Sequence, residues 1–452
     1  TGFGVVGGDF SLYSSVYMEH ETGISNQMYR AEVRTGEPTI ATTYNNIWGT
    51  VYSNIKNAKI AIQKCQEDPS EQGNVEAIAK IYLAYNAAIV TDFFGDTPFT
   101  ETGILNPDGT PAYMQPKIDT QEFIYTEIHK NLDEAITLLD GGNAKDEGLS
   151  GAVGSRDYIY SGKASAWYKA ANALKARYTM RLLNKSSNKT KDLEDILTYV
   201  NNSFKSAAEE CKLTIYDGDS QVNPLWGFSY SRNSFAASES LIDKFVERND
   251  PRAPQAFIEP DPTGYIVYGY GGDQATDIES INFAPNGTPD EVQNIYGMSM
   301  ALWAITTPTQ LISYHEIKFL EAEALCRLGR KSEAEAALKE AVIAGFANTE
   351  NMLIDATENW VGGEVNLGAD VAEDYFEKSV KPLFTVNPLK ETMIQKYLSF
   401  FGASGESTEA YCDYRRMKGA GEEFVELKNP LNTNRFPYRF GYGADDVLAN
   451  PA

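Results

Sequence analysis

The sequence has few of the residues from which most catalytic sites are built. Only three histidines occur among 452 residues, and none belongs to an HExxH motif or another local metal-binding pattern. The four cysteines, Cys65, Cys211, Cys326 and Cys412, form no CxxC pair, which argues against a zinc ribbon or a thioredoxin-type redox site. No GxSxG elbow and no complete phosphate-binding loop is present. We therefore expect no catalytic residues, no metal site and no cofactor.

Glycoside hydrolysis is the enzymatic chemistry that this composition leaves open. It needs only two carboxylates about 5–9 Å apart, and the chain has 63 acidic residues. Most of these acids are expected to be solvated surface charges. A glycan-degrading enzyme stays an alternative to a binding protein.

Positive charge is also scarce. The chain has 39 Lys and Arg against 63 Asp and Glu, a formal net charge of −24. Nucleic acids and anionic lipid surfaces both need a basic protein surface, so neither is an expected partner. No run of about 18 apolar residues is found, so we expect no helix to span a bilayer. Neutral ligands and partner proteins with a basic face fit this charge.

Aromatic residues and helical patterns, by contrast, are plentiful. Tyr, at 27 residues, outnumbers Phe, and its apolar ring with a polar tip suits a wet contact surface. Residues 311–346 show two stripes of small apolar residues at helical spacing, separated by Gly329, which predicts a close-packed helix pair like those of tetratricopeptide repeats. Further amphipathic helices are indicated at residues 48–62, 78–89, 123–139, 164–183, 192–208, 371–380 and 393–401.

The region between these helices has a different character. Residues 214–307 are punctuated by turn signals such as Asn223-Pro224 and Asp250-Pro251, and they are dense in Trp and Tyr. The fold class predicted is mainly α, with tetratricopeptide-like helix pairs forming a scaffold, a large irregular loop-rich lobe and little β structure. We expect residues 1–213 and 308–452 to form the helical core, and residues 214–307 to form the lobe that faces the ligand.

Six segments, in this order along the chain, together resemble the SusD/RagB family of outer-membrane nutrient-binding lipoproteins. The similarity covers nearly the whole chain, although the lipid-bearing cysteine of the family is missing because the first cysteine is Cys65. The segments are the helix Ala79-Lys80-Ile81-Tyr82-Leu83-Ala84-Tyr85 running into Thr91-Asp92-Phe93-Phe94-Gly95-Asp96-Thr97-Pro98, the Ala-rich helix at 163–181, residues 238–252, the helix at 314–329 around Glu321-Ala322-Glu323-Ala324, the Asp-x-x-Arg stretch at 411–418, and Arg435-Phe436-Pro437-Tyr438.

This resemblance implies a non-catalytic protein that binds oligosaccharide at the cell surface. It also implies delivery of that ligand to a SusC-like TonB-dependent transporter, and residence at the outer membrane as a surface-exposed lipoprotein. Contact with the membrane would be made only through an N-terminal lipid anchor that the given sequence lacks. Another nutrient, such as a peptide or glycopeptide, is the alternative ligand.

The ligand site is expected in the aromatic part of residues 214–307. Sugar rings pack their C–H faces on aromatic rings, and their hydroxyls bond to planar polar groups. We predict that residues 223–233 form a loop in which Trp226 and Tyr230 stack on the sugar. Core packing is the alternative role for each aromatic residue. In that loop Asn223 and Arg232 would hydrogen-bond to the ligand, and the further candidate ligand-binding residues are Tyr265, Tyr268, Tyr270 and Trp303.

Overall fold

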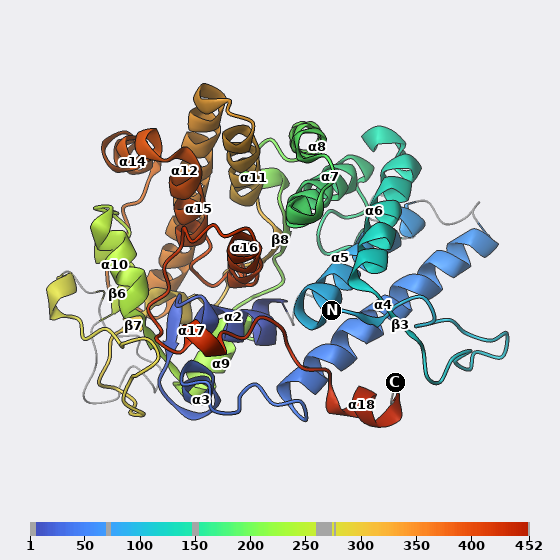
Figure 1. Cartoon of the computed structure of the whole chain (residues 1–452), viewed down its shortest axis with the longest axis horizontal. Coiled ribbons are helices and arrows are strands. Elements are labelled where there is room, and N and C mark those ends of the chain that lie inside the picture. The colour runs from blue at the N-terminus through green and yellow to red at the C-terminus, as the bar shows by residue number, and fades with distance from the viewer. Residues whose placement is uncertain (1–5, 69–73, 147–152, 259–273, 275–276, 451–452) are drawn as a thin grey trace.

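The helices form two groups that lie side by side. The structure, a computed structural model, describes residues 6–68, 74–146, 153–258, 274 and 277–450. Helices α4 to α8 make up one group and α10 to α16 the other, with the N-terminal helices between and below them (Figure 1). The predicted mainly-α fold with little β structure is confirmed.

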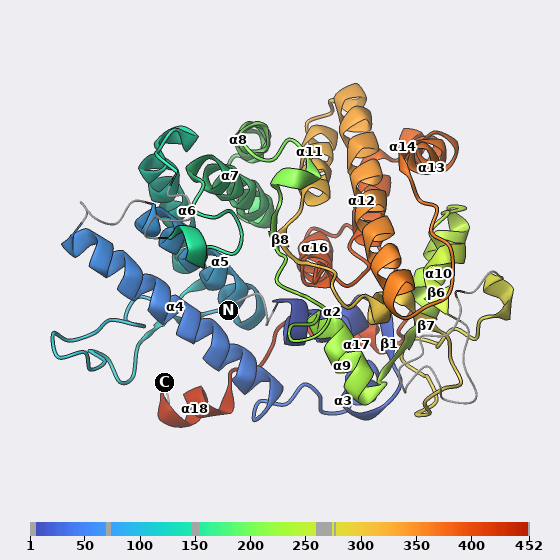
Figure 2. The ribbon, with the colours of Figure 1, turned by 180° about the vertical axis from the view of Figure 1, so that it is seen from behind.

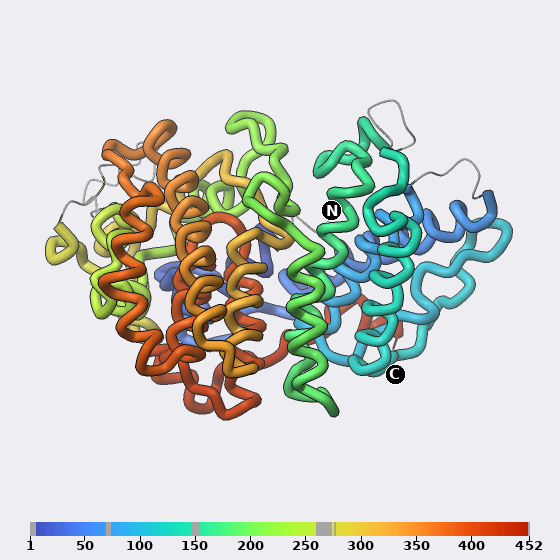
Figure 3. The backbone as a smooth tube through the Cα atoms, turned by 90° about the horizontal axis from the view of Figure 1, so that it is seen from above, coloured from blue at the N-terminus to red at the C-terminus, as the bar shows by residue number. Residues whose placement is uncertain are grey.

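The first group is a row of helices that pack on one another in chain order. Each contacts the next, from α4 on α5 to α7 on α8, and α8 contacts α11 of the second group. Seen from above, the helices continue side by side across the molecule (Figure 3). The bounds are α4 Thr43–Glu67, α5 Val75–Phe94, α6 Gln121–Leu138, α7 Ala164–Arg181 and α8 Lys189–Asn201.

Helix α5 is a buried core helix. By length and composition it is apolar enough to cross a membrane, with a mean hydropathy of 1.2, which corrects the expectation that no such stretch exists. However, 94% of that stretch is buried inside the protein. Its apolar sequence is therefore explained by packing between α4 and α6.

The second group is built around the predicted helix pair of residues 311–346. The Ser313 hydroxyl caps α11 by accepting a hydrogen bond from the backbone N–H of Glu316, and Gly329, at φ 74°, lies in the turn that follows α11. Helices α11 and α12 pack on each other and both contact α15. The bounds are α11 Tyr314–Arg327, α12 Lys331–Asn359, α13 Ala369–Tyr375, α14 Lys381–Val386, α15 Pro388–Ser399 and α16 Ser407–Gly419.

Short antiparallel strand pairs join distant parts of the chain. In the described residues every sheet has two strands, paired as β1 with β5, β2 with β3, β4 with β8 and β6 with β7. The strands are β1 Glu21–Gly23, β2 Thr97–Pro98, β3 Ile118–Asp119, β4 Cys211–Leu213, β5 Phe235–Ala237, β6 Phe257–Ile258, β7 Met298–Ser299 and β8 Thr309–Ile312. The remaining helices are α2 Ser11–Tyr17, α3 Asn26–Glu32, α9 Pro224–Arg232, α10 Glu239–Glu247, α17 Asn432–Arg435 and α18 Ala444–Ala449.

The described part of the region 214–307 pairs with strands outside it and contributes to the core. Strands β4 and β8, which lie at its two predicted boundaries, pair with each other, and β5 inside it pairs with β1. Its residues Leu225, Phe235 and Trp303 belong to the same hydrophobic core as the helix pairs. The division of the chain at residues 213 and 308 remains a prediction.

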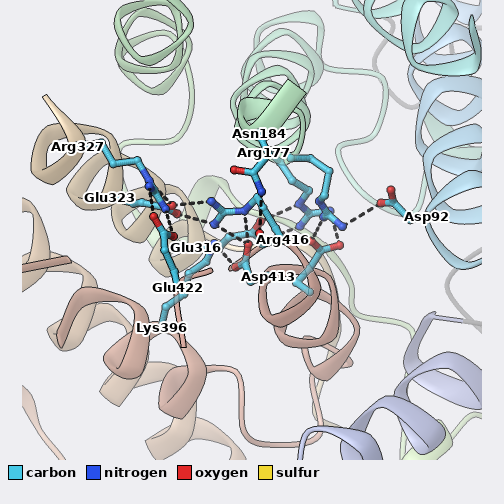
Figure 4. Close-up of polar contacts among 12 residues, drawn as sticks. Asp92, Arg177, Asn184, Glu316, Glu323, Arg327, Lys396, Asp413, Arg416 and Glu422 are labelled. Atoms are coloured by element: carbon cyan, nitrogen blue, oxygen red, sulfur yellow. Dashed lines mark hydrogen bonds and ion pairs between the residues drawn. The ribbon is translucent and has the colours of Figure 1, made fainter. Parts of the chain in front are cut away.

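An ion-pair seam connects the two groups of helices in the interior (Figure 4). Arg177 donates to both carboxylate oxygens of Glu316, at 2.7 and 2.5 Å, and Arg416 donates to both oxygens of Glu323, at 2.6 and 2.8 Å. Burial alone would raise the pKa of Glu323, but Arg416 and Arg327 hold it below its usual value. The seam comprises Asp92, Arg177, Arg181, Glu316, Glu323, Arg327, Lys396, Glu409, Asp413, Arg416 and Glu422.

Several seam residues come from the segments that carry the family resemblance. Asp92 lies in the first segment, Arg177 in the Ala-rich helix, Glu323 in the fourth segment, and Asp413 with Arg416 in the Asp-x-x-Arg stretch. Those segments therefore contribute to holding the fold together. A paired, buried charge network of this kind has a structural role and leaves no group free for a ligand.

Candidate functional site

Four aromatic side chains from three parts of the chain meet at one place, which we call the aromatic cluster: Trp226, Tyr230, Trp303 and Trp360. The rings of Trp226 and Tyr230 are stacked, with centroids 4.8 Å apart and planes 11° apart. Trp360 lies 5.6 Å from Trp226 and 5.9 Å from Tyr230, between ring centroids. Trp303 lies 6.0 Å from Trp360.

Local sequence explains how α9 presents two of these rings. The Asn223 side chain accepts hydrogen bonds from the backbone N–H groups of Leu225 and Trp226, and Pro224 occupies the first turn. Asn233, in the left-handed conformation at φ 43°, ends the helix. Trp226 and Tyr230 are four residues apart, so they lie one above the other on the same helix face.

The predicted loop of residues 223–233 is thus wrong, since Pro224–Arg232 is a helix. Its nine residues are too few to show a clear 3.6-residue repeat. The Asn-Pro pair that reads as a turn signal is also a helix start, with Asn as the cap and Pro in the first turn.

Trp360 was not among the candidate residues, because it lies outside the region 214–307. It follows the last residue of α12, whose end lies beside α9 when the molecule is seen from behind (Figure 2). The chain next to it is held by Gln274, whose backbone N–H donates to the carbonyl of Gly362 at 2.7 Å. From the sequence, Trp360 could have been noticed only as a tryptophan that follows the apolar stripe of a long helix.

Exposure differs among the four rings. Tyr230 is 44% exposed, Trp226 and Trp360 are half-buried, and Trp303 is 3% exposed beneath them. Three rings of the cluster therefore reach the surface, and the buried ring of Trp303 packs against that of Trp360. The expectation that Trp303 contacts the ligand is corrected, because its burial gives it a packing role.

The polar candidate residues have other positions. Asn223 is fully buried, and its amide nitrogen donates to the carbonyls of Thr307 at 2.7 Å and Ala403 at 2.9 Å. The oxygen and the nitrogen of this side-chain amide therefore both have partners within the protein. The side chain caps the helix, which corrects the predicted ligand contact of Asn223. The exposed Arg232 lies over the ring of Phe228 and is two residues, or about 200° around the helix, from Tyr230. Tyr265, Tyr268 and Tyr270 lie outside the described residues.

The indole N–H groups divide the five tryptophans into two sets. Those of Trp226, Trp303 and Trp360 are buried, and no described residue accepts a hydrogen bond from them. By contrast, Trp167 donates to the carboxylate of Asp157 at 2.7 Å, and Trp48 is hydrogen-bonded to Asp446. An unsatisfied buried donor costs about 1–3 kcal/mol, so these three indole groups carry a cost that the paired indoles of Trp48 and Trp167 do not.

A cavity of about 260 Å³ lies along α12, lined by none of the four cluster residues. The Asp355 carboxylate, in its wall, accepts from the backbone N–H of Thr306 at 2.8 Å, three residues after Trp303. Asp355 also precedes Trp360 by five residues, which is about 7–8 Å along a helix. Among the polar residues that line the cavity are Glu210, Lys212, Gln310, Asn348 and Asn351.

A polar atom of this cavity has no hydrogen-bond partner among the described residues. The Oε1 atom of Gln310 is buried and has no partner among the described residues, while its amide nitrogen donates to Glu210 at 3.0 Å. Asp355 by contrast is fully engaged, by Thr306, Thr307 and Asn359. Within the part of the chain that the structure describes, no group of three or more His, Cys, Asp or Glu is placed to hold a metal ion.

Comparison with known proteins identifies the class to which this fold and site belong. The family model described as starch-binding and associating with the outer membrane, the SusD-like family, matches residues 13–443. The chain belongs to this family, and the resemblance seen in the sequence is confirmed. The chain matches no curated protein sequence.

Solved structures agree with this assignment. A SusD/RagB family protein from Bacteroides thetaiotaomicron VPI-5482 is 45% identical, over 98% of this chain and 90% of the other, with a TM-score of 0.89. A chitin-binding protein is 22% identical over 100% and 93% of the two chains (TM-score 0.72), and a chitin-binding SusD homologue from Flavobacterium johnsoniae is 19% identical over 97% and 88% (TM-score 0.69). The last two show the shared fold.

At the level of the family, the function is nutrient binding at the outer membrane. Members of the SusD-like family are non-catalytic binding proteins, and the family description places them in association with the outer membrane. The family association is with nutrient ligands and SusC-like transporters.

Proposed function

We propose that this protein binds a neutral oligosaccharide at the aromatic cluster without altering it, and passes it to a SusC-like transporter. The observation that carries the proposal is the grouping of the exposed Tyr230 ring with the half-buried rings of Trp226 and Trp360, whose buried indole N–H groups have no acceptor among the described residues. It is supported by family membership.

The physical fit is to a sugar. The C–H faces of pyranose rings pack on indole and phenol rings, and a sugar hydroxyl can accept from an indole N–H. In the cavity along α12 the side chains of Asn348, Asn351 and Gln310 supply donors and acceptors for further hydroxyls. A net charge of −24 disfavours an acidic glycan through long-range repulsion. The preferred ligand is therefore an uncharged chain of more than one sugar unit, extending from the cluster into the cavity.

Delivery to a transporter and attachment through a lipid both follow from the family rather than from contacts in this chain. We place the protein at the cell surface, held to the outer membrane as a lipoprotein, with a TonB-dependent transporter as its partner. Because the chain would hand over its ligand, binding is expected to be reversible, and the sugar should be recovered intact.

Isothermal titration with maltooligosaccharides and chitooligosaccharides tests this proposal. Trp226→Ala and Trp360→Ala should each weaken binding of the sugar that the wild type takes by about 30-fold, as expected for a central aromatic contact worth about 2 kcal/mol. Tyr230→Ala should weaken it less. The matched control is Tyr113→Ala, because Tyr113 is 47% exposed but lies outside the cluster.

Two results would overturn the proposal. Equal affinities in wild type, Trp226→Ala and Trp360→Ala would remove the aromatic cluster as the site. New reducing ends in the sugar recovered after incubation, measured by mass spectrometry, would show hydrolysis and would make the protein a glycan-degrading enzyme.

A further inference from the structure

A second cavity lies far along the chain from the aromatic cluster, in the first group of helices. It has a volume of about 380 Å³, within the range of small-molecule sites. Its walls are α4, α5, the segment 153–159 and Leu213 of β4, none of which contributes to the aromatic cluster. The aromatic cluster therefore does not account for this cavity.

Small side chains on two packed helices leave the space open. Ala58 and Ala61 face it from α4, and Ala79 faces it from α5, with Ile78 and Ile159 beside them. Protein interiors are normally filled to close packing, and larger residues at these positions would close the gap. The apolar walls suit the hydrocarbon body of a ligand.

Arg156 is the only charged residue among the described residues that line this cavity. It ends a short 3-10 helix, Gly154–Arg156, and is exposed at the cavity. No ion pair or side-chain hydrogen bond engages its guanidinium in the described part of the chain, although acids outnumber bases by 63 to 39. An unpaired arginine beside an apolar cavity is suited to a carboxylate, which its planar fork binds with two parallel hydrogen bonds.

Polar groups on the α4 and α5 walls complete the site. Tyr85 is 4% exposed, and no described residue hydrogen-bonds to its hydroxyl. Burial raises its pKa, so the hydroxyl stays protonated and can donate. The amide of Asn54 donates to Asn86 at 3.2 Å across the α4–α5 interface, which leaves the Asn54 carbonyl oxygen as an acceptor.

We propose that this cavity binds a small organic anion, a monocarboxylate with an aromatic or branched apolar body. The body would occupy the space lined by Ala58, Ala61 and Ala79, and the carboxylate would pair with Arg156. This site is independent of the oligosaccharide site in position and in ligand chemistry, so one proposal can fail while the other stands.

The test compares an anion with its neutral analogue. Binding of 4-phenylbutyrate and of 4-phenylbutanamide to the full chain is measured by ligand-observed NMR titration. The wild type should bind the carboxylate about tenfold more tightly than the amide, because a hydrogen bond to a charged group is stronger than one to a neutral group. Arg156→Gln should abolish this preference. Arg435→Gln is the matched control, because Arg435 is also exposed and no ion pair is found for it in the described residues.

A space-filling variant tests the location separately. Ala61 is half-buried at the wall, so Ala61→Phe should fold and should abolish binding of both probes, with thermal unfolding as the check on folding. The proposal is overturned if neither probe binds at millimolar concentration, if the charge preference survives Arg156→Gln, or if Ala61→Phe binds as the wild type does. In all of these variants oligosaccharide binding should be unchanged, which separates this test from that of the aromatic cluster.

Discussion

The ion-pair seam and the aromatic cluster are both partly buried and rich in polar atoms, but they differ in how those atoms are paired. In the seam, Glu323 accepts from Arg327 and Arg416, and Arg177 engages both Glu316 oxygens and the Leu311 carbonyl. In the cluster, three indole N–H groups have no acceptor among the described residues. Buried polar atoms with a structural role need partners within the protein, whereas polar atoms without such a partner can be paired by a ligand.

The seam and the cluster also differ in whether recognisable sequence motifs contain their residues. The segments that resemble the family most clearly supply the seam, which lies inside the molecule. The cluster is assembled from α9, residue 303 and the end of α12, and no short motif contains it. Recognition of the family therefore comes from residues that maintain the fold, while the proposed ligand site of this member is built from residues that such motifs do not include.

The largest effect is expected when the pairing of the seam is broken. Glu323→Ala should lower the free energy of unfolding by about 3–5 kcal/mol, because it leaves the buried charge of Arg416 without its main partner. Urea denaturation measures this loss. The control is Glu423→Ala, which removes an exposed ion pair with Lys418 and should change stability little. Similar losses in the two variants would contradict the structural role of the seam.

Glu21 sharpens the comparison, because it is a buried carboxylate that forms no ion pair with a described residue. One of its oxygens accepts from the Ser299 hydroxyl, the other has no partner in the part of the chain that the structure describes, and burial raises its pKa from 4.5 to about 8. Between those pH values the folded state holds a proton that the unfolded chain has released, so this group makes stability fall as pH rises.

Glu21→Gln, which does not titrate, should therefore gain stability relative to wild type by roughly 3 kcal/mol more at pH 8 than at pH 5. Denaturation of both proteins at the two pH values measures the gain. A pH-independent difference would mean that Glu21 has an ordinary pKa in the folded protein.

Asn223 tests whether a fully paired polar residue beside the cluster acts in the fold or on the ligand. Asn223→Ala removes the cap of α9 and two hydrogen bonds to carbonyls, and should cost about 2 kcal/mol of stability. Asn188→Ala, which removes the exposed cap of α8, should cost less. Oligosaccharide affinity of the folded Asn223→Ala protein should stay within a fewfold of wild type, and a loss as large as that of Trp360→Ala would return Asn223 to the ligand site.

The smallest expected effect on stability comes from Trp360→Phe, which keeps an aromatic ring and removes an N–H that has no acceptor among the described residues. Stability should be nearly unchanged, and oligosaccharide affinity should fall by about fivefold, the value of one neutral hydrogen bond. The matched variant is Trp167→Phe. It removes the donor to Asp157, so it should lower stability by about 1–3 kcal/mol and leave affinity unchanged. The opposite pattern would contradict the division of the tryptophans into two sets.

The sequence predicted the fold better than the site, for physical reasons. The pair α11–α12 was recognisable because its small-residue stripes and Gly329 are local signals that span many residues. Trp226 and Tyr230 were expected in one loop, whereas they lie together because a helix brings residues four apart onto one face.

What was missed depends on contacts between distant segments. Trp360 joins Trp226 across more than a hundred residues, and the engagement of Asn223 depends on the carbonyls of Thr307 and Ala403. Neither contact has a spacing that a single sequence reveals. The burial of Trp303 likewise depends on what packs over it.

The most direct test of the central claim uses the five tryptophans as reporters. In protein labelled with ¹⁵N at the indole nitrogen, titration with the bound oligosaccharide should shift the N–H resonances of Trp226 and Trp360, and that of Trp303 to a smaller extent. The resonances of Trp48 and Trp167, whose N–H groups already have acceptors, should stay in place. Shifts confined to Trp48 and Trp167, or saturable binding that moves none of the five, would contradict the account.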